Sequence, residues 1–140
     1  MLRLELVCAG RLKEPYWEAA AAEYQKRLSP LCKLAVRECP EGKPLIFPKD
    51  RVLTIALCIE GKQYNSEDWA SLFWGWADGG HSQIRFLIGG SDGLTEPDKA
   101  RAAHKLSLSP MTFPHHMARV LLLEQLYRAW TIRQGRAYHK

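Results

Sequence analysis

Short apolar runs recur along the chain, and the segments between them carry apolar residues at helical spacing. The apolar runs predict strands at residues 2–9, 32–39, 51–59, 83–89 and 105–109. The intervening segments predict helices at residues 15–28, 65–77, 95–105 and 115–135. Strands that alternate with helices are typical of a mainly parallel sheet with helices packed against it. We therefore expect an α/β fold, with a mainly parallel five- to six-stranded sheet and helices on both faces.

Residues that suit helix ends support these boundaries. Pro15 fits the first turn of its helix, because a proline at that position loses no hydrogen bond within the helix. Asn65 and Thr95 can cap the next two helices, since each side chain can accept a hydrogen bond from a free backbone N–H. Gly135 suits the end of the last helix, where a left-handed residue is common.

The last predicted helix has apolar residues on more than one stripe. They are Met117, Val120, Leu121, Leu122, Leu123, Leu126, Tyr127, Trp130 and Ile132. A helix that is apolar on most sides must be covered on most sides. We expect one face to lie on the sheet and another to meet a second copy of the chain. This predicts a homodimer, with Leu122 or Leu123 as candidate interface residues.

Composition limits the size and the class of the protein. A chain of 140 residues without internal repeats or linkers is expected to form one domain, residues 1–140. This is small for an enzyme with two substrates, so a site shared between two copies is a hypothesis to test. The net charge of +5 favours a polyanionic partner, although a merely basic protein would show the same charge.

The cysteines point to a reducing compartment. None of the four belongs to a C-x-x-C pair, and Cys8 and Cys58 lie in apolar runs where thiols pack as small hydrophobes. This pattern argues against structural zinc. No segment has the apolar length of a signal peptide or a membrane span. We therefore expect a cytoplasmic protein that does not cross a membrane.

A glycine-rich loop, FLIGGSDGL at residues 86–94, follows one predicted strand. It matches neither the dinucleotide fingerprint G-x-G-x-x-G nor a phosphate loop ending in Lys-Ser/Thr. Gly89 and Gly90 could let a ligand approach the bare backbone, and Gly93 could supply a positive φ. From this loop alone, a simple turn remains the favoured interpretation.

A second loop, LSLSPMTFPH at residues 106–115, follows the next predicted strand. Ligands of α/β proteins bind beyond the carboxyl ends of parallel strands, so the two loops could form one site. No Lys or Arg lies between Lys105 and His115. A wall of backbone and apolar side chains suits an adenine ring and a sulfur chain better than a triphosphate.

Five segments resemble one known family. They are the two loops, the segment MARVLLLEQLYRAW, the residues AYHK at 137–140 and the segment LVCAGRLKEPYWEAAAAEYQKRLSP. They resemble the bacterial large-subunit ribosomal RNA methyltransferase H family, which are pseudouridine-N3 methyltransferases of the SPOUT superfamily. The resemblance covers nearly the whole chain. Its most specific parts are AYHK and the P-H-x-x-x-R-V pattern at residues 114–120.

The resemblance implies a C-terminal trefoil knot at about residues 84–140, a homodimer, and S-adenosyl-L-methionine bound in the knot. It also implies methylation of N3 of a pseudouridine in 23S ribosomal RNA within the ribosome. The cofactor positions that it carries over are Leu57, Gly89, Leu108, Ser109, Pro110, Met111, Thr112 and Phe113.

The sequence departs from the family in two places. Family members carry a Lys- and Glu-rich helical segment before the third strand, whereas here only residues 44–50 bridge that gap. This puts the cover of one sheet face in doubt. Cys58 stands where an acidic residue is common, so no acidic role is transferred to that position.

Methyl transfer from a sulfonium is an in-line displacement, so positioning dominates catalysis. The ring nitrogen must lose a proton, and a base or a cation would assist. The candidate catalytic residues are His139, Tyr138 and Arg128, and the candidate RNA-binding residues are Lys140, Arg128 and His115. Residues 138–140 could instead be a solvated tail, and Arg128 could simply pair with Glu124 at i, i+4.

No metal site is expected, because His115 and His116 are adjacent rather than at metal-ligand spacing. His115 could instead cap or orient the loop before the last helix. Two other functions remain open besides the methyltransferase. One is a ribosome-binding module that keeps the fold without catalysis, and the other is a dinucleotide-binding protein, which the missing fingerprint disfavours.

Overall fold

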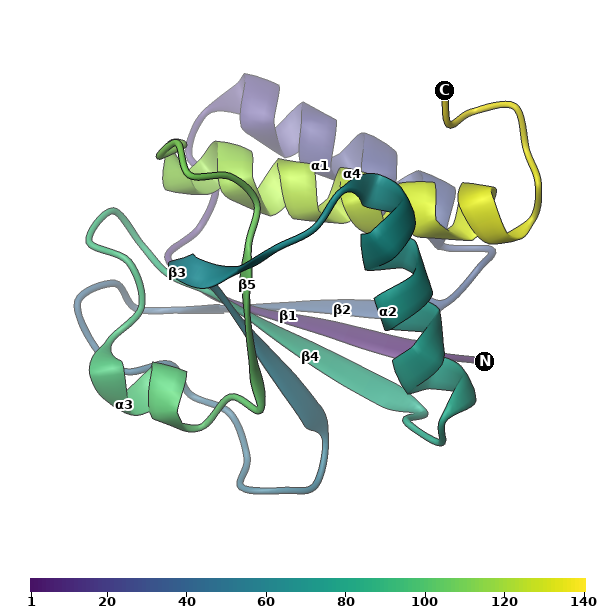
Figure 1. Ribbon diagram of the computed structural model, residues 1–140. Helices are drawn as coiled ribbons and strands as arrows, with labels where there is room; N and C mark the ends of the chain where they lie inside the picture. The colour runs from purple at the N-terminus through teal and green to yellow at the C-terminus, as the bar shows by residue number, and fades with distance from the viewer.

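The computed structural model describes all 140 residues and contains a five-stranded sheet. The strands are β1 (Arg3–Ala9), β2 (Lys33–Cys39), β3 (Leu53–Gln63), β4 (Gln83–Ile88) and β5 (His104–Ser107). Their order across the sheet is β2-β1-β4-β3-β5, and every neighbouring pair is parallel (Figure 1). The predicted parallel α/β sheet is confirmed.

Three helices connect strands, namely α1 (Pro15–Leu28), α2 (Ser66–Asp78) and α3 (Glu96–Ala100), and α4 (His115–Arg133) follows the last strand. The predicted caps form, since Asn65 accepts a hydrogen bond from the Asp68 N–H and Thr95 accepts one from the Asp98 N–H. After α4, Gly135 has a φ of 67°. This left-handed residue allows the Gly135 and Arg136 N–H groups to bond back to the last turn of the helix.

The predicted helix at 95–105 is correct at its start and wrong at its end. The helix α3 stops at Ala100, and the Ala103 N–H bonds to the Thr54 carbonyl of β3 at 2.8 Å. His104 and Lys105 are already part of β5. Pairing with β3 satisfies backbone groups that a longer helix would have bonded internally, so the strand begins early.

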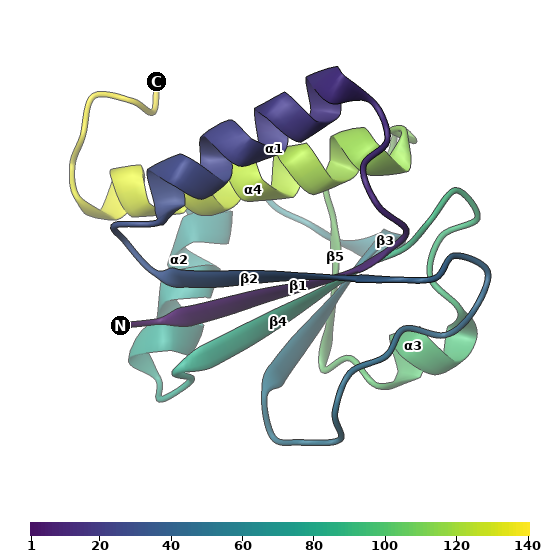
Figure 2. The same cartoon turned by 180° about the vertical axis from the view of Figure 1, so that it is seen from behind.

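Three helices cover one face of the sheet. Figures 1 and 2 show α1 and α4 side by side above this face, with α2 beside them. The largest buried side chains of this core come from the strands and from α2 and α4, including Leu6, Phe86, Phe73, Leu122 and Leu126. Most of the buried apolar residues of the chain therefore lie on this side of the sheet.

The apolar residues of α4 are largely covered within one chain. It packs against both α1 and α2 as well as the sheet. Leu122 and Leu123 are 0% and 1% exposed, so the prediction that one of them lies free for a partner is wrong. The half-buried apolar residues of α4 include Leu121 and Tyr127 instead.

The connector, residues 40–52, covers much of the opposite face together with α3. Leu45 and Phe47 are buried against Val7 and Leu87 of the sheet. The Leu45 N–H donates to the Asp98 carboxylate at 2.9 Å, which ties the connector to α3. The doubt over the cover of this face is thereby resolved, because the short connector and one short helix replace a longer helical segment.

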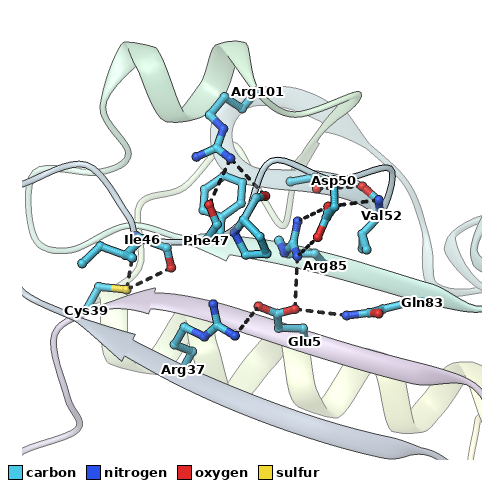
Figure 3. A network of polar contacts seen from close by, with 12 residues as sticks. Glu5, Arg37, Cys39, Ile46, Phe47, Asp50, Val52, Gln83, Arg85 and Arg101 are labelled. Carbon is cyan, nitrogen blue, oxygen red and sulfur yellow. Dashed lines mark hydrogen bonds and ion pairs between the residues drawn. The ribbon is translucent and has the colours of Figure 1, made fainter.

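A buried ionic network lies under the connector (Figure 3). Arg85 of β4 is 2% exposed and reaches Asp50 of the connector at 2.9 Å and Glu5 of β1 at 3.4 Å. Hydrogen bonds from Arg85 outweigh burial and hold the pKa of Asp50 below its ordinary value of 3.8. Arg101 adds hydrogen bonds to the carbonyls of Phe47 and Pro48, at 3.1 and 3.2 Å.

Candidate functional site

A cavity of about 540 Å³ lies at the carboxyl ends of β4 and β5. The residues that line it include Leu57, Gly89, Leu108, Ser109, Met111, Thr112 and Phe113. All of these were predicted to contact the cofactor. Of the predicted set, only Pro110 is not part of the lining. The two loops, which follow successive strands along the chain, thus form one wall, as the parallel sheet requires.

The glycine loop is both a tight turn and part of this wall. The Gly93 N–H donates to the Gly90 carbonyl at 3.0 Å, and Gly93 has a φ of 79°. A Cβ on Gly89 would lie 2.4 Å from the Gly93 carbonyl carbon. Gly89 is therefore needed for the close approach of the loop to itself, whether or not a ligand is present.

The loop between β5 and α4 is shaped by its serines. Ser107 donates to the Ser109 carbonyl at 3.0 Å, and the Ser109 hydroxyl accepts from the Met111 N–H at 3.0 Å. These bonds turn the loop so that Met111 is 74% exposed at the edge of the cavity. The wall offers backbone and apolar atoms, in agreement with the character predicted for it.

Sequence reasoning missed a charged pair that also lines the cavity. Lys99 of α3 reaches Glu60 of β3 at 2.9 Å. Hydrogen bonds from Cys58 and Lys99 lower the pKa of Glu60 to about 2, so it is a carboxylate at neutral pH. Burial raises the pKa of the neighbouring Cys58 thiol to about 11. The register of β3 against β5 shifts between Leu57 and Lys62, and this irregularity brings Cys58 and Glu60 to the cavity.

Residues 138–140 fold back onto the protein next to this cavity. His139 and Lys140 line a second cavity of about 540 Å³, together with Leu121 of α4. The two cavities share Ser107, Leu108 and Phe113. The predicted RNA-binding segment and the predicted cofactor wall are therefore adjacent.

The three predicted catalytic residues are linked to one another. Arg128 binds Glu124 at 2.8 Å, as the i, i+4 spacing predicted, and also lies 3.0 Å from Nδ1 of His139. Tyr138 donates to Glu124 at 2.9 Å. Because an arginine can only donate, His139 Nδ1 accepts, and Nε2 then carries the proton that meets Glu67 at 2.7 Å. Tyr138 and His139 are half-buried in these contacts rather than frayed.

The protonation of this cluster limits its chemistry. Burial and the hydrogen bond to Glu124 raise the pKa of Tyr138 to about 12. Its phenol is therefore neutral at physiological pH and acts as a donor rather than a base. The Glu124 hydrogen bond also raises the pKa of Arg128, which remains a cation.

His115 lies apart from this cluster. It begins α4 and lines the first cavity, with Nε2 3.3 Å from the Glu41 carboxylate. Burial is the main cause that lowers its pKa. Thirteen residues of helix separate it from Arg128, which corresponds to roughly 20 Å. The two residues predicted to touch RNA from α4 are thus at different places on the molecule.

The comparisons with known proteins identify the family. The family model described as "Predicted SPOUT methyltransferase" matches residues 2–139. The chain belongs to the SPOUT methyltransferase family. Membership implies the trefoil knot predicted for residues 84–140. No helix of this SPOUT protein has the length and apolar character needed to cross a membrane.

Curated relatives share much of the sequence of this SPOUT protein. Two of them, from Clostridium novyi (strain NT) and Clostridium botulinum (strain Langeland / NCTC 10281 / Type F), are named ribosomal RNA large subunit methyltransferase H. Each is 40% identical over 159 residues, which cover 99% of this chain and 100% of the relative. The recognised resemblance to that family is confirmed. The aligned length exceeds the 140 residues of this chain, so the relatives are longer than this chain.

Solved structures share the fold at low sequence identity. A probable methylase family protein from Haemophilus influenzae Rd KW20 matches with a TM-score of 0.58 and 10% identity, over 94% of this chain and 66% of that one. A probable methyltransferase from Bordetella pertussis Tohama I matches with a TM-score of 0.58 and 14% identity, over 91% and 96%. Both agree with the SPOUT assignment of the fold.

Proposed function

We propose that this protein transfers a methyl group from S-adenosyl-L-methionine to N3 of a pseudouridine in 23S ribosomal RNA, in the cytoplasm. The observation that carries the proposal is the cavity that gathers Leu57, Gly89 and the 108–113 loop. Its volume of about 540 Å³ lies within the range of small-molecule sites. The relatives named ribosomal RNA large subunit methyltransferase H support the RNA substrate.

The lining of the cavity fits S-adenosylmethionine, which supplies a methyl group on an electrophilic sulfur. Leu57, Leu108 and Phe113 offer an apolar wall for the adenine ring. The backbone of the two loops can read the polar edge of that ring. Glu60, held as a carboxylate, can accept hydrogen bonds from ribose hydroxyl groups. Lys99 supplies a cation for a carboxylate of the ligand.

The Arg128 cluster is proposed to act on the RNA base. When RNA draws Arg128 away from Nδ1 of His139, that nitrogen can take the proton of the ring nitrogen, and Arg128 can stabilise the anion that remains. Tyr138 positions both through the carboxylate of Glu124, which it shares with Arg128. Lys140 is exposed and can contact phosphate. His115 is proposed to contact RNA at the other end of α4.

We also propose that the protein works as a homodimer. Leu121 is a half-buried apolar residue beside His139 in the second cavity. A second copy seated on this part of α4 would bury Leu121 and bring one chain's residues 138–140 towards the other chain's cofactor cavity. One active site would then be built from two chains.

Calorimetry with S-adenosylhomocysteine, followed by transfer of labelled methyl groups to ribosomes, tests the proposal. Micromolar binding together with label at N3 of a pseudouridine in 23S RNA supports the methyltransferase. Binding to ribosomes without cofactor affinity would instead support a non-catalytic module. Preference for a dinucleotide such as NAD would reject both. The first outcome is the expected one.

A further inference from the structure

The start of α4 and the connector place three potential metal ligands together. His115 and His116 open the helix, and Glu41 belongs to the connector. One ligand atom from each lies within 4.8 Å of the other two. The two histidines are adjacent in the sequence, whereas the third ligand comes from a segment more than seventy residues away.

His116 is oriented as a metal-binding histidine would be. It is 6% exposed, and its Nδ1 lies 2.9 Å from the Glu14 carboxylate. A carboxylate can only accept a hydrogen bond, so Nδ1 of a neutral His116 ring must carry the proton. Its Nε2 then keeps a free lone pair. That Nε2 is buried and has no hydrogen-bond partner. A buried acceptor without a partner is costly, and a metal ion would satisfy it.

His115 faces the same point. Its ring lies 4.0 Å from that of His116, centroid to centroid, and its Nε2 also lacks a well-formed hydrogen bond. The nearest polar atom to that nitrogen is Oε1 of Glu41 at 3.3 Å. Glu41 is an exposed residue, so its carboxylate is free to move towards an ion.

We propose that Glu41, His115 and His116 bind a divalent ion of the zinc class, with Glu14 as the carboxylate that orients His116 from outside. Two imidazoles and one carboxylate suit zinc, whereas magnesium prefers oxygen ligands. Zinc holds its ligands at about 2.1 Å, which places them roughly 3.4 Å apart in a tetrahedron. The three ligand atoms lie within 4.8 Å of one another, so the side chains would draw together around the ion. The fourth position is left for water.

The site would join the connector to the wall of the first cavity. His115 lines that cavity, and a Cβ on Gly90 would lie 3.3 Å from Glu41. A bound ion would therefore hold Glu41, the glycine loop and the start of α4 in one arrangement. Metal binding is a property of the free protein, so it does not depend on the proposed methyl transfer.

Calorimetric titration of the chelator-treated full chain with zinc chloride tests this proposal. We expect saturable binding of one ion per chain and a higher melting temperature with zinc, and no binding of magnesium. Glu41→Gln should weaken zinc binding at least about tenfold, and His116→Ala more strongly. Glu14→Gln should weaken it about tenfold, as loss of an outer carboxylate does. Cobalt in place of zinc should give the visible absorption of a tetrahedral site.

Two matched controls separate this site from adventitious binding. His81→Ala removes a histidine outside the cluster, and Cys58→Ser removes the most accessible thiol. Neither change should alter zinc affinity. Unchanged affinity in Glu41→Gln, an exposed substitution that leaves the core intact, would overturn the proposal. Loss of binding in Cys58→Ser would assign the ion to a thiol site and would overturn it as well.

Discussion

Arg85 donates to both carboxylate oxygens of Asp50, at 3.0 and 2.9 Å, and thereby joins the central strand β4 to the connector. The same guanidinium lies 3.4 Å from Glu5 of β1. The connector is thus held over the sheet by a buried ion network as well as by Leu45 and Phe47. This arrangement stands where family members are expected to carry a longer helical segment.

Removal of Arg85 should destabilise the fold strongly. Arg85→Ala leaves Glu5 buried without its main cationic partner, and loss of one member of a buried pair costs about 3–5 kcal/mol. Urea unfolding would measure this change. Arg37→Ala is the matched control, because Arg37 is half exposed and lies 3.6 Å from the same carboxylate. It should cost at most about 1 kcal/mol.

Asp50 should contribute stability that disappears in acid. Its pKa is lowered in the folded state, so it binds fewer protons there than when the chain is unfolded. The contribution of Asp50 to stability is therefore complete at pH values above 3.8, the pKa of its carboxyl in the unfolded chain. It is lost as the pH falls through the lower pKa of the folded state. Asp50→Asn should be less stable than the parent at about pH 6, and the difference should shrink at about pH 3. A difference independent of pH in urea unfolding would contradict this origin.

Filling the first cavity, which holds Leu57 and Gly89 in its lining, should block cofactor binding. Ala118 lines it from the first turns of α4, where a larger side chain is compatible with a helix. Ala118→Phe should lower affinity for S-adenosylhomocysteine at least about tenfold in calorimetry, since the ring would occupy ligand volume. Ala22→Phe, an exposed change on α1, should leave both affinity and circular dichroism unchanged. This pair is a cleaner test than a change at Gly89, where a Cβ would meet the loop backbone itself.

Deletion of residues 138–140 should separate RNA chemistry from cofactor binding. These residues contact Glu124, Arg128 and Glu67 but do not line the first cavity. Cofactor affinity should therefore stay within a few-fold, while methyl transfer to ribosomes should fall by orders of magnitude. Transfer at the parental rate would show that the segment only packs on the surface. A large loss of cofactor affinity would assign it to the methyl donor instead.

The homodimer should depend on Leu121 rather than on the buried leucines beside it. Leu121→Glu places a charge on the half-buried side of α4, and an unpaired charge in an interface is strongly disfavoured. Light scattering at micromolar concentration should report twice the chain mass for the parent and one chain mass for the variant. A parent that is monomeric at that concentration would remove the shared-site proposal.

Periodicity in the sequence was sufficient for most of the local structure. The alternation of apolar runs with helical segments predicted the parallel sheet, and Asn65, Thr95 and Gly135 marked helix ends that the structure contains. These are local effects, set by backbone hydrogen bonds within a few residues. The predicted end of the third helix at residue 105 was wrong, since α3 stops at Ala100. The pairing of Ala103 with Thr54 that ends it is a contact between distant segments.

The motifs also determined which loops form the candidate site. Both loops follow strands of a parallel sheet, so their meeting at one edge was implied by the topology. The topology did not imply the role of Gly89. A Cβ at this position would clash with Gly93, which lies four residues later and comes close only in the folded turn. Which apolar residues of α4 lie outward was also undecided, because the helix pattern does not say that both α1 and α2 pack against it.

Only the tertiary structure decided which distant charged groups meet. Three sets of charged groups join segments that lie well apart in the chain. They are Glu60 with Lys99, Arg85 with Asp50 and Glu5, and Glu41 with His115. Their partners follow from how the strands are ordered and where the connector crosses the sheet. No periodic pattern encodes such pairings, because a charged residue on an exposed loop and one on a buried strand look alike until the burial of each is known.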